Sequence, residues 1–213
     1  MGKRSGGSDP SSASVTFGGE RLARALAAID ERNADDPNRI RVRGELRPKE
    51  LAHAELASAW VERLRPDASE ALRLAARAHH VRRWVIPRSE YPDGRAGYHR
   101  WRRALHAHHA SEVGAVLAAC GYADDEVERV QAIVTKQGLG SDPEVQALED
   151  ALCLVFLETQ FRDLAARLDD EKIVDVTART LRKMSAGAIE AAGALDLDAS
   201  EREWLRRALA ALE

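Results

Sequence analysis

Apolar side chains recur every three to four residues along most of this chain, the spacing that places them on one face of an α-helix. The clearest stripe runs from Leu51 through Leu56 and Trp60 to Leu64, and Pro66 ends it. The same spacing predicts helices over residues 17–30, 69–86, 98–120, 124–137, 143–168, 170–184, 185–193 and 199–212. Strand signals are almost absent: residues 40–46 alternate weakly and predict an extended connector or a single strand without a sheet partner.

Capping residues mark several of the helix boundaries. Ser69 can cap the helix that follows it, Asp142 with Pro143 begins another, and Gly121 is a typical C-terminal stop. Between helices, residues 84–97 contain Pro87, Pro92 and two glycines, which predicts a long ordered loop. The pattern predicts an all-α fold, a single compact bundle of about eight helices over residues 17–213. The Gly- and Ser-rich residues 1–16 are expected to form a disordered tail.

Composition narrows the class of protein. The 213 residues carry 32 Lys and Arg against 35 Asp and Glu, a formal charge of -3, so any anion site must be local. Cys120 and Cys153 form no CxxC pair, and the chain shows no signal peptide and no apolar run long enough to span a bilayer, so a cytoplasmic location and no membrane partner are expected. Walker A, GxGxxG, GxSxG and HExxH sequences are missing, which removes support for the common nucleotide-binding and serine-hydrolase classes.

Three groups of residues are candidates for chemistry. All seven histidines fall between His53 and His109, and helical spacing directs at least one imidazole from each of two helices toward a common cleft. For any single histidine, the alternative is a side chain that is exposed or hydrogen-bonded to a neighbouring helix. Glu149 and Asp150 lie within a buried stripe but point about 100° apart, so only one can be central. The alternatives for that carboxylate are metal ligation and an ion pair with a nearby arginine.

The third group is an arginine-dense segment between residues 77 and 103, interleaved with aromatic residues. Guanidinium groups bind phosphate or carboxylate through two hydrogen bonds, and flat rings stack on ligands. The alternative is a solvated helix face whose charges pair with acidic neighbours. The predicted substrate-binding residues are Arg82, Arg83, Trp84, Arg88, Arg95 and Tyr98.

The order His80, His109 and Asp150, each on a separate predicted helix, resembles the HD-domain superfamily of metal-dependent phosphohydrolases. That resemblance implies an HD-like core and a divalent metal ion, Mn, Fe or Mg, bound by these three residues. Ala110 stands where the superfamily has an aspartate, and Glu112 is the candidate substitute.

A second resemblance covers nearly everything from Pro48 to Met184. The segments RAHHVRRWVIPRSEYP, GRAGYHRWR, DPEVQALEDALCLVFLE and LRKMS are similar to a bacterial and fungal family described as a domain of unknown function. Automated descriptions sometimes label that family glutamyl-tRNA synthetase-like, but this chain has no nucleotide-binding α/β motif. The resemblance therefore implies a family without implying a chemistry.

These observations lead to one hypothesis and two rivals. The hypothesis is a metal-dependent hydrolase of a small phosphorylated molecule such as a nucleotide, in which metal-bound water attacks phosphorus. Glu149 or Glu112 would act as the base or as an alternative ligand, and Lys136 would assist. The first rival is a non-haem iron oxygenase on an HD-like scaffold. The second is a non-enzymatic helical module that binds RNA or another anion, which the charge of -3 makes the weaker option.

Overall fold

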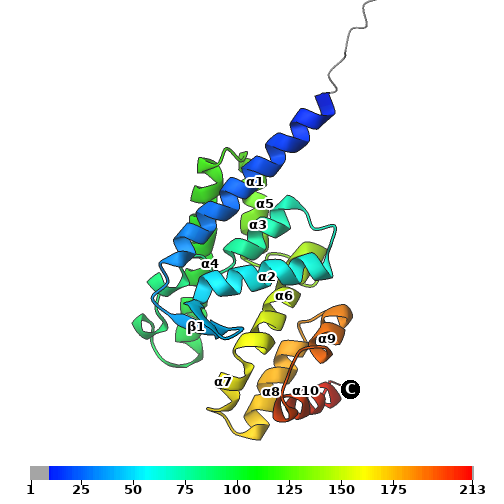
Figure 1. The fold of residues 1–213 in the computed structure, drawn as a ribbon. Helices are drawn as coiled ribbons and strands as arrows, with labels where there is room; N and C mark the ends of the chain where they lie inside the picture. The colour runs from blue at the N-terminus through cyan, green and yellow to red at the C-terminus, as the bar shows by residue number, and fades with distance from the viewer. Residues whose placement is uncertain (1–9, 213) are drawn as a thin grey trace, which may run out of the picture.

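The computed structural model describes residues 10–212 and has an all-α fold (Figure 1). The helices are α1 (Pro10–Ala34), α2 (Lys49–Leu64), α3 (Glu70–Ala78), α4 (Gly94–Ala119), α5 (Asp124–Val134), α6 (Pro143–Thr159), α7 (Phe161–Ala165), α8 (Asp170–Leu181), α9 (Ala186–Gly193) and α10 (Ala199–Ala210). Two short strands, β1 (Arg39–Val42) and β2 (Glu45–Pro48), and two 3-10 turns, η1 (Arg83–Val85) and η2 (Arg88–Glu90), complete it. The predicted fold class is confirmed.

The N-terminal prediction is tested only in part. α1 begins at Pro10, seven residues before the predicted start at Phe17. Of the tail predicted over residues 1–16, residues 1–9 lie outside the described part of the chain.

The extended segment after α1 has the partner that the sequence did not reveal. β1 pairs antiparallel with β2 in a hairpin whose register sets Arg39 opposite Pro48 and Val42 opposite Glu45. Arg43 and Gly44 form the turn, both with positive φ, which is the geometry of a tight hairpin. The prediction of a lone strand was wrong because the partner follows within three residues. The hairpin delivers the chain to the first residue of α2.

Two helices end earlier than their apolar periodicity predicts. α3 ends at Ala78 although apolar spacing continues toward Pro87, because the chain turns through His79 and His80 and Arg82 takes a left-handed φ of 49°. The predicted helix over residues 143–168 is divided at Gln160 into α6 and α7. The predicted caps are confirmed: the Ser69 side chain accepts a hydrogen bond from the Leu72 backbone N–H, and Asp142 accepts from Glu144 and Val145.

The loop between α3 and α4 is ordered by two contacts with α4. The Trp101 indole N–H donates to the carbonyl of Ile86 at 2.9 Å. At Gly97 a Cβ atom would lie 1.8 Å from the Pro92 carbonyl oxygen, so only glycine permits this approach. The predicted ordered loop is thus held against the first turns of α4.

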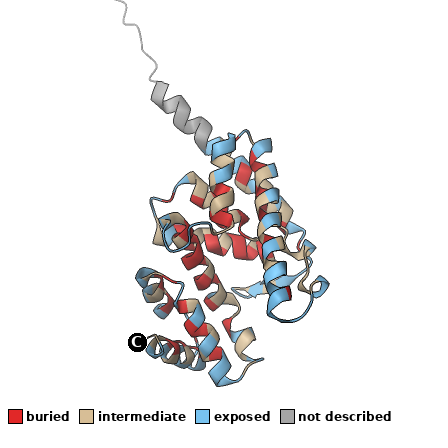
Figure 2. Ribbon diagram, turned by 180° about the vertical axis from the view of Figure 1, so that it is seen from behind, coloured by how far each residue is buried: buried red, intermediate tan, exposed pale blue. Residues whose placement is uncertain are grey.

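The buried core follows α6, which runs from the layer of α2, α3 and α5 toward α8, α9 and α10 (Figures 1 and 2). Leu148, Leu154 and Leu157 of α6 are fully buried, as are Leu74 of α3 and Leu181 of α8. Burial of such side chains contributes about 2 kcal/mol each. Because α6 packs against helices on both of its sides, the residues on its two faces determine which side chains lie at the centre of the protein.

None of the helices in residues 10–212 combines the length and the apolar character needed to cross a lipid bilayer.

Candidate functional site

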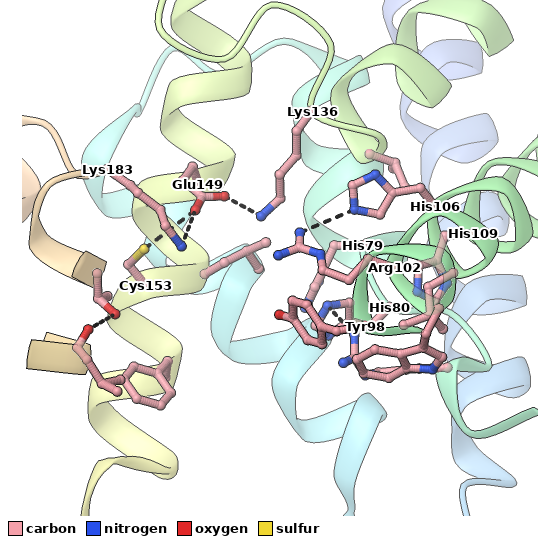
Figure 3. Close-up of a pocket in the computed structure, with 18 residues that line it drawn as sticks. His79, His80, Tyr98, Arg102, His106, His109, Lys136, Glu149, Cys153 and Lys183 are labelled. Atoms are coloured by element: carbon pink, nitrogen blue, oxygen red, sulfur yellow. Dashed lines mark hydrogen bonds and ion pairs between the residues drawn. The ribbon is translucent and has the colours of Figure 1, made fainter. Parts of the chain in front are cut away.

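A cavity of about 380 Å³ opens between α4, α6 and α8 (Figure 3). Its charged lining consists of Arg83, Arg102, Lys136 and Lys183, with Glu149 as the carboxylate among them. We call this cavity the cationic pocket. Its remaining walls are imidazoles, aromatic rings and small apolar side chains: His79, His80, Tyr98, Trp101, Leu105, His106, His109, Val134, Leu152, Cys153, Phe156, Val176 and Thr180.

Helical spacing explains how α4 and α6 supply most of this lining. Tyr98, Arg102, Leu105 and His109 recur at three- and four-residue intervals and share one face of α4. Glu149, Leu152, Cys153 and Phe156 do the same on α6. The two faces oppose one another, and Lys183 enters from the turn after α8. Segments more than eighty residues apart in the sequence therefore meet at one cavity.

The pocket carries a net of three positive charges when its imidazoles are neutral, since four cations face one carboxylate. Glu149 is 4% exposed, and burial alone would raise its pKa. The Lys136 and Lys183 ammonium groups outweigh burial and hold the pKa of Glu149 below its ordinary value. Lys136 forms a direct ion pair with Glu149, and the Lys183 nitrogen lies 3.7 Å from the other carboxylate oxygen. One negative charge thus orients two cations and leaves an excess of positive charge.

Lys136 occupies a strained position. Its φ is 61°, in the left-handed region that usually holds glycine or asparagine just after a helix. Glycines occur close by, at positions 138 and 140, but position 136 itself holds a lysine. The ammonium group of this lysine reaches the pocket. Strain of this kind persists where surrounding contacts fix it, and it marks Lys136 as a functional candidate.

Arg102 brings into the pocket a guanidinium that has no acidic partner in the described part of the chain. Its guanidinium points into the centre of the pocket, and its one hydrogen bond is a long contact of 3.4 Å to His106 Nε2 (Figure 3). Within residues 10–212 it forms no ion pair with a carboxylate. A half-buried guanidinium without a counterion favours an anion as its partner.

His109 lines the pocket, and one of its ring nitrogens has no hydrogen-bond partner among the described residues. Its ring is 2% exposed, and Nδ1 lies 3.0 Å from the Val81 carbonyl oxygen, so Nδ1 carries the proton and donates it. Nε2 is then an unprotonated acceptor, and it is buried without a hydrogen-bond partner in the described residues. Burial lowers the pKa of His109 to about 3. This imidazole is therefore neutral near pH 7 and can accept a proton or a hydrogen bond.

His80 lies beside His109, with 5.6 Å between ring centroids. Its Nδ1 is 3.3 Å from the buried Glu50 carboxylate, and its Nε2 is 3.1 Å from the Arg83 guanidinium. Burial and the Arg83 charge lower the pKa of His80 to about 3. The two predicted imidazoles from separate segments do converge, as the sequence indicated.

Asp150 faces away from them. Its carboxylate accepts hydrogen bonds from the Ser185 backbone N–H at 2.9 Å, the Ser185 hydroxyl at 2.6 Å and the Gln146 amide at 2.9 Å. Ser185 is the N-cap of α9, so Asp150 fastens that helix start to α6. The predicted role of Asp150 as a metal ligand is corrected here, because adjacent residues on a helix diverge by about 100° and Glu149 takes the pocket side.

The donor set for the predicted metal does not form. Among residues 10–212, no three His, Cys, Asp or Glu side chains are grouped so that they could hold a metal ion. With Asp150 saturated by α6 and α9, His80 and His109 remain as two nitrogen donors beside a cluster of cations that repels a divalent ion. The residues present therefore do not fit the Mn, Fe or Mg ion expected from the sequence, either for the hydrolase or for the oxygenase.

Five further predicted residues lie elsewhere. Glu112 forms ion pairs with Arg32 and Arg82 at 3.4 and 3.2 Å, outside the pocket. The Arg88 guanidinium donates to the Tyr91 carbonyl within its own loop, and Arg95 contacts His99 on the surface of α4. Trp84 belongs to η1 and is absent from the pocket lining. Of the predicted binding residues, the pocket thus receives Arg83 and Tyr98, and it also receives the predicted catalytic residues Lys136 and Glu149.

Sequence reasoning missed Arg102, Lys183 and Trp101 as site residues. Arg102 precedes His109 by seven residues, so its place on the same helix face could have been inferred. Lys183 gave no such signal, because only tertiary packing brings the turn after α8 to α6. Cys153 also lines the pocket, but burial raises the pKa of its thiol to about 12, so it is not a ready nucleophile.

Residues 23–204 match a family model described as a domain of unknown function, DUF4202. The chain belongs to the DUF4202 family. This match extends the resemblance predicted over Pro48–Met184, while it gives no support to the HD-domain resemblance or to the synthetase label. Comparisons with curated proteins and with solved structures gave no match. The function of this DUF4202 chain must therefore be argued from the pocket.

Proposed function

We propose that this protein binds a small phosphorylated molecule in the cationic pocket. The observation that carries the proposal is the convergence of four cations on one cavity against a single carboxylate. Phosphate and diphosphate groups match this arrangement in charge, and the guanidinium groups of Arg83 and Arg102 can donate two hydrogen bonds each. The cavity volume of about 380 Å³ suits a ligand of nucleotide size.

The aromatic wall supports the same ligand class. Trp101 lines the pocket with its ring fixed by the hydrogen bond to Ile86, and the Arg83 guanidinium stacks over that ring at 5.0 Å. Tyr98 lies beside Trp101, 5.8 Å between centroids. Flat faces next to cations are typical of sites that bind a planar ring and a phosphate together.

Calorimetric titration with inorganic pyrophosphate tests this proposal. Arg102→Met removes a charge without leaving a protein carboxylate unpaired, so it is expected to weaken pyrophosphate binding at least tenfold with little loss of stability. Arg100→Met is the matched control, because Arg100 is an exposed arginine two residues earlier on α4. Its affinity should stay within twofold of the parent protein.

Equal losses in both variants would contradict the proposal. They would show that the open arginine surface of α4 binds the anion rather than the pocket, which is the behaviour of the nucleic-acid-binding module. Binding to such a surface would also fall steeply with added salt, because many exposed contacts release counterions together.

We further propose that the bound molecule is hydrolysed, because His109 lines the pocket and its Nε2 is an acceptor without a partner among the described residues. In this reaction Nε2 takes a proton from a water molecule whose oxygen attacks phosphorus. The bond from phosphorus to the leaving oxygen breaks, and that oxygen receives the proton back from the imidazolium. The bound anion raises the pKa of His109 by its charge, and the pocket cations stabilise charge that develops on the phosphoryl oxygens.

Phosphate release from a panel of nucleotides and sugar phosphates tests this step. His109→Gln should abolish release while pyrophosphate binding stays within threefold, since glutamine keeps a polar group and removes the base. If no member of the panel releases phosphate although it binds, the protein is a binding module and the hydrolase proposal fails.

A further inference from the structure

A second cationic cavity adjoins the first. It measures about 250 Å³ and is lined by Arg39 of β1, Lys49 of α2 and Arg167 beyond α7, with Asp163 as its one carboxylate. Within residues 10–212, Arg39, Lys49 and Arg167 form no ion pair with a carboxylate. We call this cavity the hairpin pocket. Its three unneutralised cations against one acid give it the same sign of charge as the cationic pocket.

The hairpin of β1 and β2 brings two of these cations close together. Its register sets Arg39 opposite Pro48, so Arg39 lies beside Lys49 although ten residues separate them. The Lys49 backbone N–H donates to the Asn38 carbonyl at 2.9 Å and closes the hairpin onto the start of α2. The strand pair of this all-α protein thus holds two cations at the rim of one cavity.

Phe156 lines both pockets. It is half-buried on α6, and its ring packs against Phe161 with 6.4 Å between centroids, which restrains its orientation. A planar ring is therefore shared by two cavities that are each rich in positive charge. A ligand whose central group lies against Phe156 could place one anionic group in each of the two cavities.

We propose that the ligand carries two phosphoryl groups at the two ends of one ribose, as in a nucleoside 3′,5′-bisphosphate. One phosphoryl group lies in the cationic pocket, the other in the hairpin pocket, and the ribose that joins them lies against Phe156. This inference rests on the proposed function, and it deepens it by naming the substrate class. Cavities of about 380 and 250 Å³ have room for one small molecule of this kind.

Three nucleotides separate this arrangement from its alternatives in calorimetric titrations of the full chain. AMP has one phosphoryl group, ADP has two in a row at the 5′ position, and adenosine 3′,5′-bisphosphate has two that flank the ribose. Because ADP and the bisphosphate have the same nucleoside and the same number of phosphoryl groups, only their placement differs. We expect the bisphosphate to bind at least tenfold more tightly than ADP.

Variants locate the second phosphoryl group. Lys49→Met and Arg167→Met should each weaken bisphosphate binding at least fivefold and leave AMP binding within twofold. Arg24→Met, at an exposed arginine of α1, is the matched control and should change neither affinity. Phe156→Leu keeps an apolar side chain but removes the ring, so it should weaken binding of both nucleotides more than binding of inorganic pyrophosphate. A melting temperature for each variant identifies any that fails to fold.

The outcomes distinguish this inference from the proposed function. If ADP and the bisphosphate bind equally and Lys49→Met alters neither, the hairpin pocket is no subsite, while the Arg102→Met effect on pyrophosphate can still stand. If pyrophosphate itself does not bind, the proposed function fails first. A 5′-phosphorylated oligonucleotide that binds tenfold more tightly than the bisphosphate would overturn the small-molecule assignment in favour of nucleic acid.

Discussion

Glu149 and Asp150 are neighbours on α6, equally buried at 4% exposure, and they serve two different regions of the protein. Glu149 meets Lys136 and Lys183 in the cationic pocket, where it offsets part of a positive charge. Asp150 meets Ser185 at the start of α9, where its carboxylate receives three neutral donors. One buried carboxylate belongs to a site and the other to the scaffold. The difference lies in the partners, because the two side chains are equally buried but point about 100° apart on the helix.

The largest expected effect is the loss of stability when the Asp150 carboxylate is removed. Asp150→Ala leaves the Ser185 N–H and hydroxyl and the Gln146 amide without their acceptor in a buried place, so we expect a loss of about 3 kcal/mol in the free energy of unfolding. Asp150→Asn keeps one acceptor oxygen and should lose less. Denaturant titration measures both, and pyrophosphate affinity should stay unchanged in Asp150→Asn. A large drop in that affinity with intact stability would place Asp150 in the site after all.

The next largest expected effect is a loss of stability at low pH, caused by His109 in the cationic pocket. The pKa of His109 is lowered by burial to about 3, below the ordinary value of about 6.5 that it regains on unfolding. The unfolded chain therefore binds the proton first as the pH falls below 6.5, and stability present at neutral pH is lost between about pH 6.5 and pH 3.

At pH 5 this shift costs about 2 kcal/mol of folding free energy through His109 alone. The stability difference between pH 7 and pH 5 should accordingly be smaller in His109→Gln than in the parent protein, when both are unfolded with urea at the two pH values. The same difference in both proteins would show that His109 is protonated in the folded state.

The smallest expected effect is a gain in pyrophosphate affinity when Glu149 loses its charge. Glu149→Gln removes the negative charge of the pocket and keeps the shape of the side chain, so a bound anion loses a repulsion of about 1 kcal/mol. Pyrophosphate should then bind about fivefold more tightly, whereas the Asp150 variants show no such gain. Weaker binding in a stable Glu149→Gln protein would mean that Glu149 acts by positioning Lys136.

The comparison also shows how far the sequence could lead. Periodicity and caps predicted the helical class, and Ser69, Asp142 and Gly121 marked the boundaries of α3, α6 and α4, because these signals are local. The division at Gln160 and the hairpin were missed, since short-range alternation does not reveal a strand partner or a break inside a long apolar run. His80 and His109 lie close together, as predicted, but the predicted third ligand, Asp150, binds Ser185 instead, and Glu149 is the carboxylate that lines the pocket.

The sequence by itself determined that this chain folds into helices, that its histidines and arginines crowd one stretch, and that one of Glu149 and Asp150 would be central. These properties depend on residues a few positions apart. Tertiary structure alone decided that Glu149 is the central carboxylate, that Lys183 joins it, and that Arg88, Arg95 and Glu112 do not. The physical reason is that charge–charge contacts act through space, and the fold brings cations from α4, the turn after α5 and the turn after α8 to the cavity that Glu149 lines.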